Sequence, residues 1–143
     1  ESKKNKAVTC LLTCNDVKNI PYIDVIIPII VGPEIIAGST RMKAGTATKM
    51  VLNMISTTAM IKLNKTYKNI MVDLKISNEK LLNRGIKIIS SLTGVDYLEA
   101  KNLLKASKNN VKVAIVMQKL NLDYKSSEKM LLSHNGSLEK ILH

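Results

Sequence analysis

The sequence is poor in large aromatic side chains and in arginine. Its 143 residues contain no Phe, no Trp, four Tyr and only two Arg, Arg41 and Arg84, although the formal net charge is +11. Single-stranded nucleic acid is stacked on aromatic rings, and guanine is read most often by Arg. We therefore interpret the charge as a Lys-rich solvated surface and predict no nucleic-acid partner. A basic nucleic-acid-binding module on the terminal helices is the alternative, which steeply salt-dependent binding would reveal.

Long apolar runs and a usable cysteine pair are also missing. The longest apolar run, residues 25–31, contains Pro28 and is too short to cross a bilayer, and the first six residues lack the apolar stretch of a signal peptide. Cys10 and Cys14 would lie about 13 Å apart on an extended strand, beyond disulfide reach. We expect a cytoplasmic protein with no membrane partner, no metal site and buried, reduced thiols.

The chain nevertheless has enough apolar residues, 45%, for a packed core. Residues 7–13 and 24–31 are typical of strands, and the second is the β-branched run of a parallel strand covered on both faces. Two strands alone make no stable sheet. We therefore predict the C-terminal part of a larger α/β domain over residues 1–75, followed by a small all-α domain over residues 76–143.

Helical spacing predicts a long helix over residues 41–63, and residues 64–74 are expected to connect it to the helical domain. Ser77 is the predicted N-cap of the next helix, which should end at Gly94. Four further N-caps are predicted downstream: Asp96, Asn110, Asp123 and Ser137. Residues 95–104 resemble residues 122–131, 27 positions later, which we interpret as two similarly capped amphipathic helices rather than a true repeat.

The segment from residue 32 to residue 49 carries the most chemical information. It leaves an apolar strand and enters the long helix, and ligands bind at such a junction in open α/β sheets. Gly38 permits a tight turn, while Ser39 and Thr40 offer hydroxyls to an oxyanion. Arg41 and Lys43 are cations at a helix start, where the dipole favours an anion. The alternative is a capped helix start with solvated cations.

A glycine inside this helix, Gly45, indicates close approach by a ligand or another backbone, because glycine costs up to about 1 kcal/mol relative to alanine there.

The same segment resembles the signature of the family that unites bacterial N-acetylmuramic acid 6-phosphate etherases with the animal glucokinase regulatory protein. The resemblance lies in Gly-Pro-Glu at residues 32–34, Gly-Ser-Thr-Arg-Met-Lys at residues 38–43 and Lys49. Residues 51–56, 69–73 and 77–81 also resemble the etherases. Nearly the whole chain is similar, but to the second half of a family member only.

This resemblance implies a sugar isomerase (SIS) fold, a parallel sheet with flanking helices that binds phosphosugars, and a homodimer. It implies an enzyme, a carbon–oxygen lyase without metal or cofactor, that removes the D-lactyl ether from N-acetylmuramic acid 6-phosphate in peptidoglycan recycling. The products are N-acetylglucosamine 6-phosphate and D-lactate. A non-catalytic sugar-phosphate sensor like the glucokinase regulatory protein is the alternative.

By the same resemblance, the acid/base glutamates and the main phosphate loop belong to the other half of the family's chain, so the chain alone is expected to be inactive. Glu34 is not assigned their role. The residues expected to bind the phosphorylated amino sugar are Gly38, Ser39, Thr40, Arg41 and Lys43. Lys80, placed third in its helix by the Ser77 cap, is the candidate catalytic residue, because a cation there suits an anion or developing oxyanion.

Overall fold

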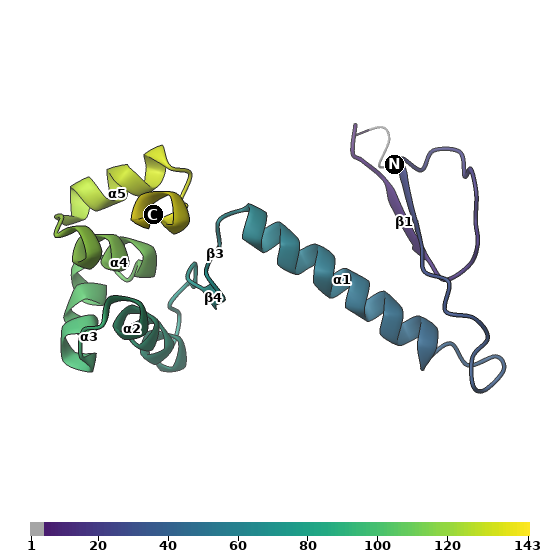
Figure 1. Ribbon diagram of the computed structural model, residues 1–143, viewed down its shortest axis with the longest axis horizontal. Coiled ribbons are helices and arrows are strands. Elements are labelled where there is room, and N and C mark those ends of the chain that lie inside the picture. Colours follow the sequence, from purple (N-terminus) through teal and green to yellow (C-terminus); the bar gives the residue numbers. More distant parts are fainter. Residues whose placement is uncertain (1–4) are drawn as a thin grey trace. The chain divides into compact units, whose positions relative to one another are not determined.

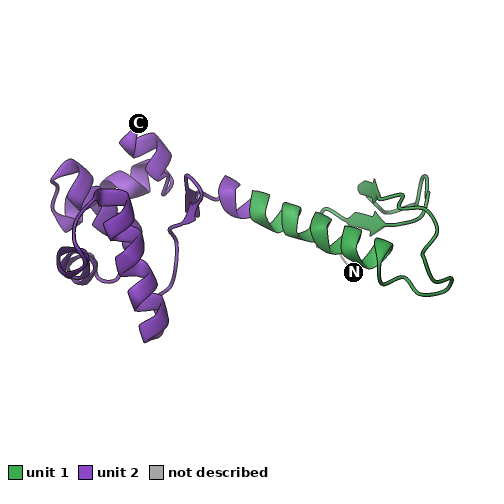
Figure 2. Cartoon of the chain, turned by 60° about the horizontal axis from the view of Figure 1, so that its bottom comes forward, with its two compact units in different colours: residues 1–58 green, residues 59–143 purple. Residues whose placement is uncertain are grey.

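The computed structural model describes residues 5–143, which form a mixed α/β chain with two small sheets and six helices (Figure 1). The chain divides into two compact units, unit 1 (Glu1–Thr58) and unit 2 (Ala59–His143), coloured separately in Figure 2. The boundary falls inside helix α1 (Lys43–Lys62). The mixed α/β class is confirmed, whereas the SIS assignment and the boundary between residues 75 and 76 stay predictions.

Unit 1 holds a parallel pair of strands. β1 (Cys10–Thr13) runs beside β2 (Val25–Pro28), with Cys10 opposite Val25. The register is set at the start of both strands, where the backbone amide and hydroxyl of Thr9 each donate to Asp24 Oδ2 over 2.8 Å. Both strands are shorter than the sequence predicts, and the second lacks the expected cover on both faces, since Val25 is 45% exposed.

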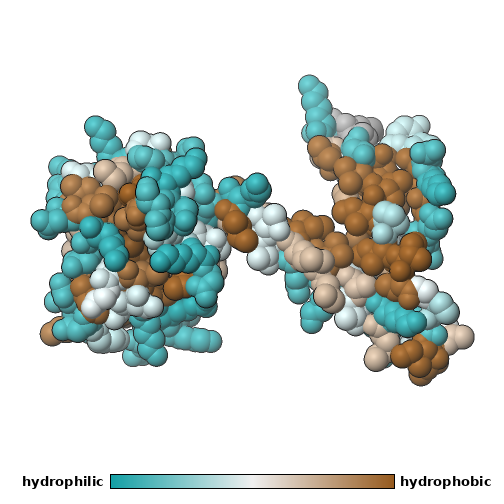
Figure 3. Space-filling model, viewed as in Figure 1, coloured by the Kyte–Doolittle hydropathy of each residue, from teal (hydrophilic) through white to brown (hydrophobic). Residues whose placement is uncertain are grey.

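Helix α1 follows within two residues of its predicted bounds, but it buries none of its side chains. Met50, Leu52 and Met60 are 59%, 55% and 46% exposed, although they point in different directions around the helix axis. A helix that is apolar on all sides is typical of a buried position. Figure 3 shows apolar residues gathered on the visible face of this unit. No residue of the described range 5–58 is buried.

The cysteine prediction was only half right. Both thiols are free, as expected, but Cys10 is exposed and Cys14 is half-buried. The reason is the same sparse packing, because a single helix does not cover a two-stranded sheet.

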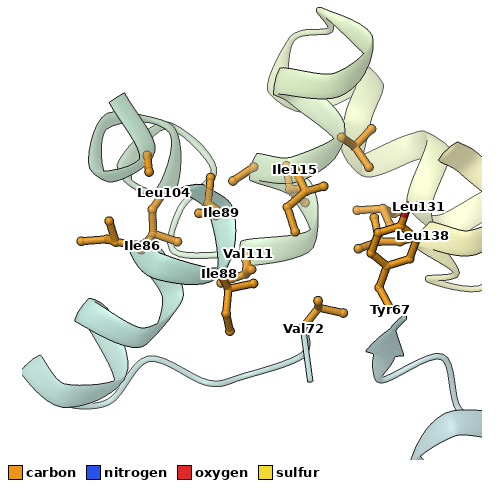
Figure 4. Close-up of a cluster of buried hydrophobic side chains, with 14 residues drawn as sticks. Tyr67, Val72, Ile86, Ile88, Ile89, Leu104, Val111, Ile115, Leu131 and Leu138 are labelled. Atoms are coloured by element: carbon orange, nitrogen blue, oxygen red, sulfur yellow. The ribbon is translucent and has the colours of Figure 1, made fainter. Parts of the chain in front are cut away.

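Unit 2 contains all the buried apolar side chains of the described residues. A short antiparallel hairpin, β3 (Thr66–Tyr67) and β4 (Ile70–Met71), precedes five helices. These are α2 (Glu79–Thr93), α3 (Tyr97–Ala106), α4 (Val111–Leu120), α5 (Tyr124–Ser133) and α6 (Leu138–Leu142). Tyr67 and Val72 bring the hairpin into the core cluster drawn in Figure 4.

The helix caps follow the sequence with one exception. Asn78, not Ser77, caps α2, because its side-chain oxygen accepts from the amide of Leu81 over 2.9 Å. Gly94 ends α2 in the left-handed conformation at φ 85°. The other four predicted N-caps are confirmed, each accepting from the amide three residues on: Asp96, Asn110, Asp123 and Ser137.

The similarity at an offset of 27 residues is a structural repeat, which corrects our interpretation of it. Helix α2 ends at a left-handed cap, Gly94, and α4 ends 27 residues later at another, Asn121 (φ 52°). The next helix begins two residues on in both copies, at N-caps Asp96 and Asp123. Helix α2 packs on α3 and α4 as α4 packs on α5 and α6.

The turn at the end of the second helix repeats bond by bond. The amide of Asn109 donates to the carbonyl of Leu104 over 2.9 Å, and that of Gly136 to Leu131 over 2.7 Å. Residues 108 and 109 have positive φ, as do residues 135 and 136. The buried positions match as well, in six pairs of side chains: Ile86 with Val113, Ile88 with Ile115, Ile89 with Val116, Ala100 with Ser127, Leu104 with Leu131, and Val111 with Leu138.

At one further buried position the copies differ in size and charge, since Gly85 in the first copy corresponds to Lys112 in the second. A Cβ at Gly85 would lie 3.3 Å from side-chain atoms of Ile76 and Val111, so little room exists there. Lys112 instead extends its ammonium to the carbonyls of Asn64 (2.7 Å) and Gly136 (3.1 Å). It thus fastens the chain after α1 to the turn before α6.

Asp73 lies beside this lysine and also pairs with Lys65. Burial opposes ionisation of Asp73, but the hydrogen bond from Lys65 and the charges of both lysines outweigh it and lower the pKa of the carboxyl. For Lys112 the balance is reversed: burial outweighs the attraction of Asp73 and lowers the pKa of the ammonium. The distances show which contacts of Lys112 are closest: its ammonium lies 2.7 Å and 3.1 Å from the two carbonyls and 3.6 Å from Asp73 Oδ1.

The buried hydroxyl of Ser127 has no hydrogen-bond partner among the described residues, and its counterpart in the first copy is Ala100. We expect Ser127→Ala to raise the free energy of unfolding by up to about 1 kcal/mol, since it removes an unpaired polar group. The reverse change, Ala100→Ser, should lower it by about 1–3 kcal/mol. Urea denaturation followed by helical circular dichroism measures both. A destabilised Ser127→Ala variant would contradict the repeat-based reading.

Replacement of the buried lysine should be costly in the same assay. In Lys112→Met the carbonyls of Asn64 and Gly136 lose their donor, so we expect about 1–3 kcal/mol of lost stability. Lys101→Met, at an exposed position of α3, is the charge-matched control and should change stability little. Equal effects of the two substitutions on stability would show that the hydrogen bonds from Lys112 to the two carbonyls do not stabilise the fold.

Candidate functional site

The glycine-rich segment forms the loop between β2 and the start of α1. Gly32 (φ 69°) and Gly38 (φ 83°) both adopt left-handed backbone, which favours glycine. Inside the loop, the amide of Ser39 donates to the carbonyl of Ile36 over 3.1 Å, which closes a tight turn at Gly38. The turn expected at Gly38 is therefore present.

The side chain of Glu34 caps helix α1. Its two carboxylate oxygens accept from the amides of Lys43 and Ala44, each over 3.0 Å. Those two hydrogen bonds, followed by the nearby charge of Lys43, outweigh desolvation and lower the pKa of the Glu34 carboxyl. The anion that we expected at this helix start is thus supplied, for these two amides, by the protein itself.

Lys43 closes the same loop from the other side. Its ammonium donates to the carbonyl of Pro33 over 2.8 Å, so its side chain folds back onto the start of the loop. Sequence reasoning placed Lys43 toward an anion and named Glu34 as part of the signature, but it did not predict that Glu34 caps the helix. The only signal was the glutamate itself, nine residues before the helix, which is far from the spacing of a capping box.

Several hydrogen-bond donors of residues 39–42, in the loop between Glu34 and Lys43, are unoccupied in the described part of the chain. The amides of Thr40, Arg41 and Met42, the hydroxyls of Ser39 and Thr40 and the guanidinium of Arg41 have no hydrogen-bond or ion-pair partner among residues 5–143. Arg41 and Thr40 are exposed and Ser39 is half-buried. Consecutive open amides at a helix start, beside hydroxyls and a cation, suit the oxygens of a phosphate or carboxylate.

Gly45 is explained by the backbone. Its amide donates to the carbonyl of Thr40 over 3.1 Å, and a Cβ on Gly45 would lie 3.2 Å from that same oxygen. The expected close approach is therefore made by the loop, which folds onto the first turn of α1.

The first turns of α1, which follow the loop, lie next to the carboxyl end of β1. Cys14, which follows that strand, places its Sγ 3.8 Å from the carbonyl of Ala44 and 3.6 Å from Thr48 Oγ1. Gly38, Ser39, Thr40, Arg41 and Lys43 thus share one loop at the strand–helix junction where open α/β sheets bind ligands.

Lys80 belongs to unit 2. Because Asn78 is the N-cap, Lys80 is the second helical residue of α2 and not the third. It is exposed and has no carboxylate partner among the described residues. Glu79 precedes it in the same turn, so the N-terminal end of α2 already carries an acid. The role of Lys80 stays a prediction.

Other kinds of site find little support in the described part of the chain. No group of three or more His, Cys, Asp or Glu side chains could hold a metal ion. Over the same residues no helix has the length and apolar content of a membrane span. A hollow of about 380 Å³ in unit 2 is lined by Asp73, Lys112 and Glu128 among others, but the lysine ammonium there is already bonded to two carbonyls.

Comparison with known proteins first defines the class. Residues 68–128, which include most of the repeat, match the family model of the C-terminal lid domain of glucokinase regulatory protein. The particular relatives are bacterial enzymes that share 46–51% identity with this chain.

N-acetylmuramic acid 6-phosphate etherase 1 of Bacillus licheniformis is 51% identical over 99% of this chain. The N-acetylmuramic acid 6-phosphate etherases of Bacillus subtilis and Lactobacillus gasseri are 47% and 46% identical, over 99% and 96% of it. The chain is therefore similar over nearly its whole length to N-acetylmuramic acid 6-phosphate etherases, and the resemblance predicted from the sequence is confirmed. It spans about half the length of these relatives, 46–47%.

The lowered pKa of Glu34 predicts how the loop responds to acid. The pKa of the Glu34 carboxyl is lower in the folded chain than in the unfolded chain. Its ionised form therefore stabilises the fold at pH values above the ordinary glutamate pKa, about 4.3. That stabilisation is lost as the pH falls through the lowered pKa of the folded chain. We expect NMR to show a Glu34 pKa below the ordinary value, with protection of the Lys43 and Ala44 amides lost at that pH.

The amide of Leu81, capped by the neutral side chain of Asn78, is the internal control and should keep its protection through the same titration. A Glu34 pKa at or above the ordinary value would contradict the observed cap.

Proposed function

We propose that this chain forms the C-terminal half of an N-acetylmuramic acid 6-phosphate etherase, and that its loop at the start of α1 contacts the sugar phosphate. The observation that carries the proposal is the set of open donors at residues 39–42, in a chain about half of whose residues are identical to those of named etherases. A phosphate dianion can accept from several amides and hydroxyls at once, and Arg41 adds a bidentate cation.

The thin packing of unit 1 supports a larger SIS-type domain. Helix α1 exposes apolar side chains on all sides, and the two-stranded sheet has both edges open among the described residues. Further parallel strands and helices would bury these groups. The relatives are about twice as long as this chain, which is enough for such a half. We propose the boundary with the helical domain near residue 76.

The reaction we propose is elimination followed by hydration. A base removes the proton at C2 of the open-chain sugar, the C3–O bond breaks and D-lactate leaves, and water then adds across the alkene to give N-acetylglucosamine 6-phosphate. We propose that the acid/base glutamates lie outside this chain, which alone should be inactive. The loop holds the phosphate, and Lys80 stabilises a developing oxyanion.

A cytoplasmic homodimer without nucleic-acid or membrane partners completes the proposal. The rival sugar-phosphate sensor shares the lid-domain match of residues 68–128, but the relatives that cover nearly this whole chain are named etherases.

We expect the complete protein to release D-lactate from N-acetylmuramic acid 6-phosphate, measured with a lactate dehydrogenase assay. Lys80→Ala should lower kcat by about 100-fold or more, the usual effect of losing one oxyanion donor. Lys87→Ala, which removes an exposed lysine two turns along α2, is the matched control and should leave kcat unchanged.

Two results would count against the proposal. Sugar-phosphate binding without any lactate release would favour the sensor. Equal activity of the Lys80 and Lys87 variants would remove Lys80 from the reaction while leaving the etherase assignment in place.

A further inference from the structure

Helix α1 begins without an acidic residue of its own. Its first turn contains no Asp or Glu, and Arg41 and Lys43 place positive charge there. The amides at a helix start carry partial positive charge and need acceptors. An isolated helix with this sequence would therefore have an unstable N-terminal turn. The hydrogen-bond acceptors for its first amides must come from residues outside the helix.

Glu34 supplies them from the far side of the loop. Both of its carboxylate oxygens are engaged, one with the amide of Lys43 and one with that of Ala44. The second tie, from the Lys43 ammonium to the carbonyl of Pro33, joins the same two ends. Residues 35–42 are thus closed into a loop whose ends are fixed by three hydrogen bonds.

This closure divides the amides at the helix start into two groups. Those of Lys43 and Ala44 are occupied by Glu34, whereas those of Thr40, Arg41 and Met42 have no acceptor among the described residues. Without Glu34, a bound anion could settle on any of these five amides, and the loop that holds the Ser39 and Thr40 hydroxyls would lose its fixed end.

We propose that Glu34 is a positioning residue: it occupies the first two helical amides and so directs a sugar phosphate to the amides of residues 40–42 and the neighbouring hydroxyls. Its effect on ligand binding rests on the function proposed above, whereas its effect on the loop does not. Both carboxylate oxygens face backbone amides, so Glu34 acts on the loop and not on the reacting atoms.

The test compares Glu34→Gln, Glu34→Asp and Glu34→Ala with wild type in the complete protein. Glutamine keeps one acceptor oxygen but loses the charge, and aspartate keeps the charge but is one methylene too short to hold both amides. Glu99→Gln, which removes an exposed acid from the first turn of α3, is the matched control. Unchanged urea denaturation of the helical unit verifies that each variant is folded.

The first readout is amide hydrogen exchange. We expect Glu34→Gln to speed exchange at Lys43 and Ala44 by about tenfold, the usual effect of losing an N-terminal cap, with Glu34→Asp between it and wild type. Glu99→Gln should leave these amides unchanged. Unaltered exchange in Glu34→Gln and Glu34→Ala would overturn the proposal, whatever the protein binds.

The second readout is kinetic. KM for N-acetylmuramic acid 6-phosphate should rise about tenfold in Glu34→Gln, while kcat changes less than twofold, because a misplaced loop weakens binding. A fall in kcat with unchanged KM and unchanged exchange would make Glu34 an acid/base group and overturn the positioning role. If wild type neither binds nor cleaves the sugar phosphate but exchange still rises in Glu34→Gln, the etherase proposal fails and the loop role of Glu34 stands.

Discussion

The carboxylate of Glu34 is the interaction on which the arrangement of the loop depends. Helix α1 starts with cations, and its first amides would otherwise face solvent or a ligand without competition. With Lys43 and Ala44 satisfied internally, three open amides, two hydroxyls and the Arg41 guanidinium remain together at one strand–helix junction. Binding chemistry that the sequence spreads over a glycine-rich stretch is thereby confined to four consecutive residues.

The two units show opposite extremes of packing. Unit 2 repeats a 27-residue motif, and each copy contributes equivalent side chains to one core. Unit 1 has no buried residue in its described part and an α1 that is apolar on all sides. A unit that exposes so much apolar surface is expected to be covered in the complete protein. The comparison fits this expectation, because the relatives contain about twice as many residues as this chain.

Local signals allowed much of unit 2 to be predicted. Asp96, Asn110, Asp123 and Ser137 cap helices because a short polar side chain can bond the amide three residues ahead. The Ser77 prediction failed because Ser77 and Asn78 are neighbours and both are good caps. The match at an offset of 27 residues was found in the sequence but not recognised as a repeat, because its buried positions share apolar character more than identity and because Ser127 and Lys112 replace Ala100 and Gly85.

Features that depend on distant contacts could not be predicted. Glu34 reaches a helix that begins nine residues later, and Lys112 bonds the carbonyl of Asn64 across 48 positions. No sequence spacing encodes either contact. The loop itself was found because its glycines, hydroxyls and cations form one contiguous motif, whereas Lys80 belongs to unit 2 and lies outside that motif.

The central claim is that residues 39–42 hold the phosphate of the sugar. Its most direct test is an NMR titration of the complete, isotope-labelled protein with N-acetylglucosamine 6-phosphate and, separately, with N-acetylglucosamine. We expect the amide resonances of Thr40, Arg41 and Met42 to shift with the phosphorylated sugar only, while those of Lys43 and Ala44 shift little. Equal shifts with both sugars, or none at residues 40–42, would contradict the account.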